Sequence, residues 1–84
     1  MSDVLFLRIK KIISALLNRP ELEEMVTHES LLRRDLGLDS LLTMDLIIML
    51  EEEMNVMIPA QLLTAANLST VGGIYRMMSG IITQ

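Results

Sequence analysis

The sequence predicts a small all-α protein, a four-helix bundle with three principal helices and one short helix. Hydrophobic residues make up 51% of the 84 residues, but aromatic residues only 2%, so leucine, isoleucine, methionine and valine must fill the core. This composition favours helices over a sheet, because strands are typically rich in aromatic and β-branched residues. Apolar residues also recur at helical spacing in three segments, which proline, glycine or asparagine residues separate.

The length and composition exclude several classes of protein. A chain of 84 residues has room for one domain, which we place over residues 1–84. The chain has no cysteine and one histidine, which excludes disulfides, thiolate metal sites, cysteine nucleophiles and multi-histidine metal sites. Its net charge of −4 repels phosphate backbones, so we expect no nucleic-acid partner. A basic protein surface is the partner that this charge favours.

No segment of the sequence is suited to cross a membrane. The longest uncharged run, residues 54–75, contains two glycines, a proline and several polar residues, which disfavour a spanning helix. Asp3 comes early and Lys10 and Lys11 interrupt the next apolar stretch, an order unlike that of a signal peptide. Together with the leading Met1, this predicts an intracellular, cytoplasmic protein, and we expect a monomer.

The first helix is expected over residues 3–17. Its apolar residues recur at spacings of four, three and four, and form one stripe: Leu5, Ile9, Ile12 and Leu16, with Ile13 beside it. Lys10, Lys11 and Ser14 are expected on the other side. Pro20 ends this helix, because the residue before a proline avoids the α conformation.

A long connection of mixed charge follows, over residues 20–39. A structureless loop of this length is unusual in a compact domain. We expect its apolar residues to hold it against the core: Met25, Val26, Leu31, Leu32, Leu36 and Leu38. Ser30 is a candidate start for a short helical turn, and Gly37 supplies a flexible φ before the next helix. His28 is interpreted as a solvated loop residue, because the sequence supplies it with no metal or catalytic partner.

The clearest helix is expected over residues 40–54, with Asp39 or Ser40 as its N-cap. One arc of this helix should face the core: Thr43, Leu46, Ile47, Leu50 and Met54. The opposite arc is both acidic and apolar, and it consists of Leu41, Asp45, Ile48 and Glu52, flanked by Met44 and Glu51. A solvated face does not need this many apolar residues, so the arc is interpreted as a docking surface. A merely solvated, charged face is the alternative.

The rest of the chain predicts an extended link over 56–59, one or two helical turns over 60–66 and a last helix over 71–82. Gly72 and Gly73 should weaken the first turn of the last helix by about 1 kcal/mol each relative to alanine.

Ser40 lies where a glycine-containing loop meets a helix N-terminus, in the run Asp35-Leu36-Gly37-Leu38-Asp39-Ser40-Leu41. Backbone N–H groups and the positive end of the helix dipole converge there, which suits a phosphate ester. A self-activated serine needs a base, and the single histidine lies twelve residues upstream. Ser40 is therefore interpreted as the acceptor of a modification, with simple N-capping as the alternative.

Taken jointly, several parts of the chain resemble the acyl carrier proteins. They are Asp39-Ser40-Leu41, Glu51-Glu52-Glu53 with Met54, Ile58-Pro59, Lys10 to Ile13, Leu31 to Leu38, and Thr70-Val71 with Ile74. In that family the serine of the Asp-Ser-Leu motif begins the second helix of a four-helix bundle. It carries a 4′-phosphopantetheine arm, which a separate transferase installs covalently from coenzyme A. The resemblance implies that Ser40, between Asp39 and Leu41, bears this arm and that the protein carries acyl thioesters without being an enzyme.

The resemblance also implies partners: phosphopantetheinyl transferase, and acyl-loading, condensing or modifying enzymes with basic and apolar docking patches. The expected contacts of the second helix, with Met44 added from its outer arc, are Leu41, Met44, Asp45, Ile48, Glu51 and Glu52. Arg33 and Arg34 are interpreted as loop residues that balance Asp35 or Glu29, with a contact to the phosphate of the arm as the alternative.

Two departures from the fatty-acid carriers bear on the pathway. Leu42 stands where those carriers often have an acid, and residues 60–66 are uncharged where those carriers are acidic. The less acidic surface favours a dedicated carrier of polyketide or mixed polyketide–peptide biosynthesis. The alternatives are a fatty-acid carrier, a peptidyl or D-alanyl carrier, and a helical adaptor without a prosthetic group.

Overall fold

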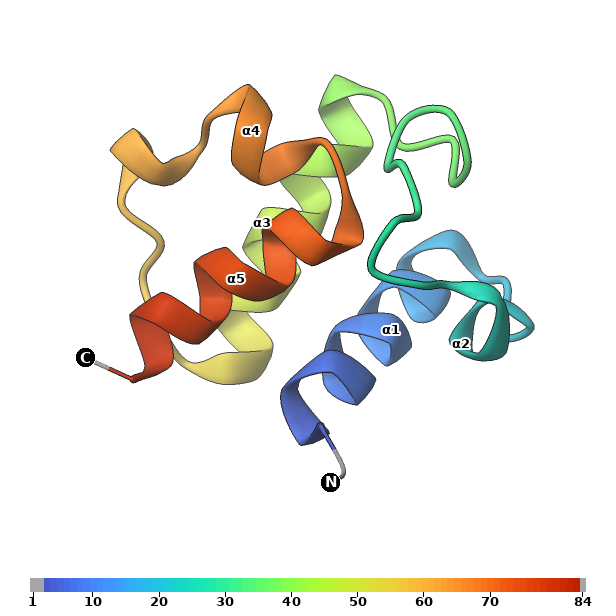
Figure 1. The fold of residues 1–84 in the computed structure, drawn as a ribbon, viewed down its shortest axis with the longest axis horizontal. Coiled ribbons are helices and arrows are strands. Elements are labelled where there is room, and N and C mark those ends of the chain that lie inside the picture. Colours follow the sequence, from blue (N-terminus) through green and yellow to red (C-terminus); the bar gives the residue numbers. More distant parts are fainter. Residues whose placement is uncertain (1–2, 84) are drawn as a thin grey trace.

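The computed structural model describes residues 3–83 and is a bundle of helices (Figure 1). The outermost residues of the expected domain, 1–2 and 84, lie outside the described residues. The described helices, in chain order, are α1 (Val4–Leu17), α2 (Leu22–Met25), α3 (Ser40–Met54), the 3₁₀ turn η1 (Ala60–Leu62), α4 (Ala65–Leu68) and α5 (Val71–Ile82). The prediction of a small all-α bundle with three principal helices is confirmed. The structure has two short α-helices, α2 and α4, whereas the sequence predicts one, over 60–66. That stretch forms η1 and the beginning of α4.

Helix α1 begins after Asp3, whose Oδ1 atom accepts a hydrogen bond from the Phe6 N–H at 3.1 Å. It ends at Asn18, which adopts the left-handed conformation with φ 53°. The residues that the helix buries are Ile9, Ile12, Ile13 and Ser14. The placement of Ser14 on the polar side is therefore wrong. Its hydroxyl donates to the Lys11 carbonyl at 2.9 Å, which satisfies the buried polar group within the helix.

Helix α3 begins after Asp39, so of the two capping alternatives the aspartate is the N-cap. Its Oδ1 atom accepts a hydrogen bond from the Leu42 N–H at 2.9 Å. The helix ends at Asn55, again in the left-handed conformation. The core-facing arc is the predicted one: Leu46, Ile47 and Leu50 are buried, and Thr43 and Met54 are half-buried.

The helices enclose one cluster of buried side chains. Helix α1 packs against α2, α3 and α5, and α4 packs against α5 (Figure 1). The largest fully buried side chains include Ile9, Ile13, Leu46, Leu50, Ile74 and Met78. The described residues form no strand, and their one β-type pairing is an isolated bridge between Leu31 and Thr70. Within the described part of the chain, no helix has both the length and the apolar character needed to cross a membrane.

The connection between α1 and α3 is held against the bundle, as its apolar residues predict. Leu32, Leu36 and Leu38 are buried. Three backbone hydrogen bonds join this connection to the start of α5: Leu32 N–H to the Ser69 carbonyl (3.0 Å), Val71 N–H to the Ser30 carbonyl (3.0 Å), and Gly72 N–H to the His28 carbonyl (2.8 Å). The connection that leads to Ser40 is thus anchored to another part of the fold.

Two details of the connection correct the expectation. Met25, at the end of α2, is 64% exposed and does not hold the connection to the core. No helix begins at Ser30. The single turns that follow it, from Asp35 N–H to the Leu31 carbonyl (3.0 Å) and from Gly37 N–H to the Arg33 carbonyl (3.1 Å), do not continue into a helix. The helical turn of this connection is α2, which lies earlier in the chain.

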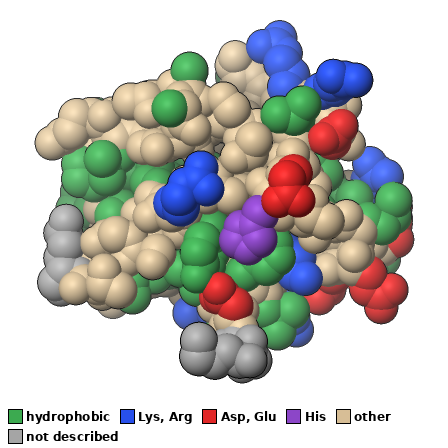
Figure 2. All heavy atoms as spheres, in the orientation of Figure 1, with side chains coloured by type: hydrophobic (Ala, Val, Ile, Leu, Met, Phe, Trp, Pro, Cys, Tyr) green, Lys and Arg blue, Asp and Glu red, His purple; other side chains and the backbone are tan. Residues whose placement is uncertain are grey.

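The interpretation of His28 as a solvated loop residue is wrong. Its ring is half-buried and stacks on Phe6, with ring centres 4.0 Å apart. It also meets the ring of Tyr75 edge to face at 5.1 Å. Figure 2 shows the histidine side chain among hydrophobic side chains at the surface. The three rings come from the connection, α1 and α5, and their attraction helps to hold these elements together.

Candidate functional site

Ser40 is exposed and is the first residue of α3. The turn before it closes through two backbone hydrogen bonds, from Gly37 N–H to the Arg33 carbonyl (3.1 Å) and from Leu38 N–H to the Leu32 carbonyl (2.8 Å). Gly37 has φ 72°, a left-handed conformation that glycine adopts without steric cost. The buried Leu38 anchors the end of this turn and leaves Ser40 at the surface.

The surroundings of Ser40 suit a modification acceptor better than a nucleophile. Among the described residues, no hydrogen bond engages the Ser40 hydroxyl. The carboxylate of Asp39 is directed to the Leu42 N–H as the helix cap. The imidazole of His28 is packed between Phe6 and Tyr75. Within residues 3–83, therefore, neither of these groups is placed to activate Ser40 as a base, while its hydroxyl is open to another molecule.

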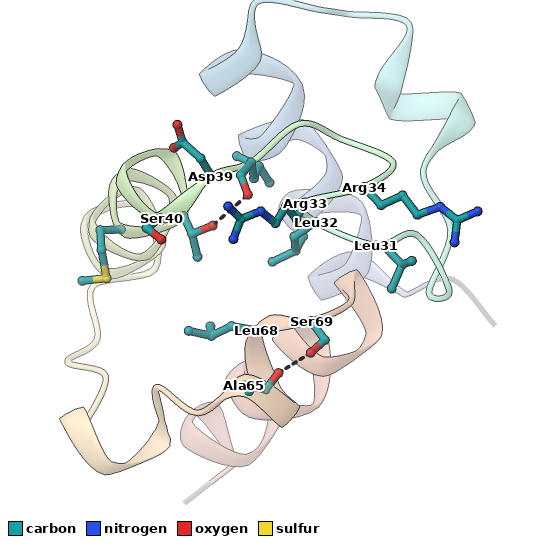
Figure 3. Close-up of a pocket in the computed structure, with 12 residues that line it drawn as sticks. Leu31, Leu32, Arg33, Arg34, Asp39, Ser40, Ala65, Leu68 and Ser69 are labelled. Atoms are coloured by element: carbon teal, nitrogen blue, oxygen red, sulfur yellow. Dashed lines mark hydrogen bonds between the residues drawn. The ribbon is translucent and has the colours of Figure 1, made fainter.

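A mostly apolar pocket of about 590 Å³ lies beside Ser40 (Figure 3). Its walls come from the loop before α3, the first turns of α3, and α4. The apolar residues that line it are Leu31, Leu32, Leu38, Met44, Ala65 and Leu68. The polar lining residues are Arg33, Arg34, Asp39, Ser40, Thr43 and Ser69. Such a pocket can hold an apolar chain that is attached at its polar edge.

Arg33 and Arg34 border the same pocket but differ in direction. Figure 3 shows the side chain of Arg33 extending toward the N-terminus of α3, whereas that of Arg34 extends away from it. Within residues 3–83 the single ion pair joins Arg19 and Glu21, so neither arginine balances an acid as the sequence predicts. The Asp35 carboxylate instead accepts a hydrogen bond from the Leu31 N–H at 2.8 Å.

Comparison with known proteins identifies the family. A sequence profile described as the phosphopantetheine attachment site matches residues 7–78. The acyl carrier protein of Treponema pallidum (strain Nichols) is 38% identical over 82 residues, 96% of this chain and 99% of that protein. The acyl carrier protein of Buchnera aphidicola subsp. Baizongia pistaciae is 43% identical over 68 residues, 81% of this chain and 82% of the relative. The chain belongs to the acyl carrier protein family.

Membership of this family means that the chain takes a covalently attached phosphopantetheine group. Acyl carrier proteins are carriers rather than catalysts, and they interact with phosphopantetheinyl transferase and with acyl-handling enzymes. The residues at the start of α3 fit such a group. They offer one exposed hydroxyl for attachment, a cationic side chain directed to the same place, and an apolar pocket beside it.

The outer arc of α3 in this carrier protein is exposed, as the sequence predicts. Its exposed members are Leu41, Met44, Asp45, Ile48 and Glu52. Leu41 is 79% exposed and Ile48 49%, which is unusual for two large aliphatic side chains on one helix face. They lie on the helix that Ser40 begins, so a protein bound there would stand close to the serine.

Glu51 is less exposed than the other acidic residues of α3 in this carrier protein. It is half-buried, and its Oε2 atom accepts a hydrogen bond from the Ile58 N–H at 2.9 Å. This bond fixes the extended link that follows α3. Sequence reasoning missed this role, because Ile58 lies beyond the end of α3, where the helical period no longer says which residues meet. We therefore treat Glu51 as a structural residue at the edge of the outer arc of α3.

Proposed function

We propose that Ser40 bears the phosphopantetheine arm and that the protein presents acyl groups, as thioesters, to partner enzymes. When bound, the arm supplies the terminal thiol that forms the thioester. The observation that carries this proposal is the exposed hydroxyl of Ser40 at the first turn of α3, with the 590 Å³ apolar pocket beside it. In this proposal the protein acts as a carrier, and the chemistry of the acyl group belongs to its partners.

The start of α3 is suited to an anionic attachment. The N–H groups of Ser40 and Leu41 have no acceptor within the helix, because the first turn lacks preceding carbonyls. Together with the helix dipole, they stabilise the negative charge of a phosphate that is joined to the Ser40 oxygen. Asp39 satisfies a later N–H group of the same turn, so it stabilises the helix without occupying the place of the phosphate.

The pocket can shield an apolar acyl group from water. Leu68 of α4 faces Leu32 of the loop across it (Figure 3), and Leu38 and Met44 also line it. Methionine and leucine side chains adapt their rotamers at low cost, so this wall can fit acyl groups of different shape. The cargo therefore rests in the pocket between transfers and emerges when a partner enzyme binds.

The outer arc of α3 is the proposed docking surface for these partners. Leu41, Met44 and Ile48 supply apolar contacts, and Asp45 and Glu52 attract basic patches on the partner. The partners are phosphopantetheinyl transferase and the enzymes that load, condense or modify the acyl group.

The pathway that we favour is polyketide or mixed polyketide–peptide biosynthesis. The support is the uncharged surface of η1 and α4, since residues 60–70 contain no acidic or basic side chain. A partner that binds on the pocket side would meet this surface, which is uncharged rather than acidic. The measurement is the rate at which the malonyl-loaded protein serves a polyketide ketosynthase and a fatty-acid ketosynthase. Faster use by the fatty-acid enzyme would assign the carrier to fatty-acid synthesis instead.

Intact mass tests the attachment site. The protein is incubated with coenzyme A, Mg²⁺ and a broad-specificity phosphopantetheinyl transferase, and it should gain one phosphopantetheinyl unit. Ser40→Ala should gain none. Ser69→Ala is the matched control, because Ser69 lines the same pocket but donates its hydroxyl to the Ala65 carbonyl. If no form gains mass, or if peptide mapping places the unit on Ser69, the proposal is wrong.

A further inference from the structure

We propose that Arg33 binds the phosphate of the arm and directs the arm over the pocket, whereas Arg34 has no part in this. The inference rests on the attachment at Ser40 proposed above, and it concerns where the attached group lies. The starting point is that two similar, adjacent side chains border one pocket and point in different directions (Figure 3).

The backbone of Arg33 is held in place. Its carbonyl accepts the Gly37 N–H at 3.1 Å, and the preceding Leu32 is 1% exposed and donates its N–H to the Ser69 carbonyl at 3.0 Å. The arginine therefore projects from an anchored turn rather than from a loose loop. The fold therefore fixes the point from which the Arg33 side chain extends toward the start of α3 (Figure 3).

Arg33 lacks an anionic partner within the described chain. No hydrogen bond or ion pair engages its guanidinium among residues 3–83. Of the carboxylates near it in the sequence, Asp35 accepts the Leu31 N–H at 2.8 Å and Asp39 accepts the Leu42 N–H at 2.9 Å. Glu29 forms no ion pair with Arg33 within residues 3–83. The five N–H donors of the guanidinium are thus available to a ligand.

Two positive elements converge at Ser40. One is the N-terminus of α3, which carries a partial positive charge of about half an elementary charge. The other is the guanidinium of Arg33. An anion placed between them attracts both. The phosphodiester of the arm is such an anion, because its non-bridging oxygens carry a negative charge. It would lie between the two elements, since its phosphorus is joined directly to the Ser40 oxygen.

The guanidinium suits this group in shape as well as in charge. Its planar fork of donors matches two phosphate oxygens, which a lysine ammonium does not do. A phosphate held on the Arg33 side of Ser40 sends the arm along the pocket wall formed by Leu32 and Leu68. Loss of Arg33 should therefore free the arm to extend into solvent more of the time.

The test uses wild type, Arg33→Gln and Arg34→Gln, each in unmodified and modified form. Intact mass establishes loading in every case. Nuclear magnetic resonance then follows the side-chain Nε–H signals of both arginines and the ³¹P signal of the phosphodiester. On loading, the Arg33 Nε–H signal should shift several-fold more than that of Arg34. The ³¹P shift should change in Arg33→Gln and stay at its wild-type value in Arg34→Gln.

Further measurements separate phosphate binding from a structural effect. The unmodified Arg33→Gln protein should melt like wild type, because Arg33 is exposed. Arg33→Lys should restore the ³¹P shift in part, since it keeps the charge but not the fork. If loading succeeds and the Arg33 signal does not move, or if Arg34→Gln changes the ³¹P shift as much, the role of Arg33 is refuted while the attachment stands. Absence of loading in wild type would refute both.

Discussion

The hydroxyl of Tyr75 on α5 donates a hydrogen bond to the Oδ2 atom of Asp3, the N-cap of α1, at 2.5 Å. The two residues are 72 positions apart, so this bond joins the beginning of the chain to its last helix. It lies next to the stacked rings of Phe6 and His28. The carboxylate of Asp3 thus contacts two helices: Oδ1 caps α1, and Oδ2 accepts the hydrogen bond from α5.

This bond predicts opposite pKa changes at its two ends. The bond from Tyr75, followed by the Phe6 N–H, lowers the pKa of Asp3 below its ordinary 3.8. The bond to Asp3 raises the pKa of Tyr75 above its ordinary 10.0. The Asp3 contribution to stability is present above about pH 4 and is lost as the pH falls through its folded-state pKa. The Tyr75 contribution is present below about pH 10 and is lost as the pH rises through its folded-state pKa.

The titration of Tyr75 can be measured directly, because the chain has one tyrosine and no tryptophan. The ultraviolet absorbance of tyrosinate should show a midpoint above 10.0 in the folded protein. Asp3→Asn keeps the helix cap but removes the charge, so the midpoint should fall back toward 10.0. An ordinary midpoint in wild type would contradict the hydrogen bond.

The two adjacent isoleucines of α3 should respond differently to truncation. Ile47 is 3% exposed, so Ile47→Ala should lower the free energy of unfolding by about 2–5 kcal/mol. Ile48 is 49% exposed, so Ile48→Ala should cost less than about 0.5 kcal/mol. The same Ile48 variant should weaken partner binding by about 1 kcal/mol or more if it anchors the docking surface. Urea melts and a binding titration measure both effects, and equal melts would place Ile48 in the core.

The acids of α3 should divide into docking and structural residues. Asp45→Lys and Glu52→Lys should slow transfer by partner enzymes in a salt-dependent way, because both side chains are exposed. Their effect on unfolding should stay within about 1 kcal/mol. Unchanged transfer rates at low salt would remove these two acids from the docking surface.

A matched pair of truncations isolates the structural acid. Glu51→Ala should destabilise the protein by about 1–3 kcal/mol, because the Ile58 N–H loses its acceptor beside the buried Ile58 side chain. Glu52→Ala should leave the denaturation midpoint almost unchanged. If both variants unfold at the same denaturant concentration, the Glu51 bond contributes nothing to stability.

The glycines of α5 should also separate into required and dispensable positions. A Cβ atom at Gly73 would lie 2.7 Å from the Asn67 carbonyl oxygen, so Gly73→Ala should cost about 1–3 kcal/mol. A Cβ atom at Gly80 would meet no atom within 4 Å, so Gly80→Ala should stabilise the helix by about 0.4–1 kcal/mol. Thermal melts of the two variants should move in opposite directions. A stabilised Gly73→Ala protein would show that α4 and α5 do not pack as closely as described.

The principal helices and the setting of Ser40 follow from local sequence. The apolar spacing within 3–17, 40–54 and 71–82 extends over three or more turns, which is enough to define a helix and the face that it buries. The run from Gly37 to Ser40 predicts a turn, a cap and an exposed hydroxyl from residues that are neighbours in the chain. The two arcs of α3, including buried Ile47 and exposed Ile48, follow from the same period.

Other features depend on contacts between segments that are distant in the sequence. The four-residue helix α2 is too short to show a period or to be stable alone, so packing against α1 decides it. The environment of His28 depends on Phe6 and Tyr75. The need for a glycine at position 73 depends on the nearby backbone of Asn67. From the sequence alone, Gly73 predicts only a weakened first turn of α5.

In the candidate site, too, some features follow from local sequence and others depend on contacts between distant segments. The sequence alone determined the three helices and the position of Ser40 at the start of one of them, because both depend on residues within a few turns of each other. Only the tertiary structure decided that α4 closes a pocket beside Ser40, that Arg33 and Arg34 point apart, and that Glu51 supports Ile58. The physical reason is that these relationships require elements with no common spacing to meet in space, and packing of the shared core determines where they meet.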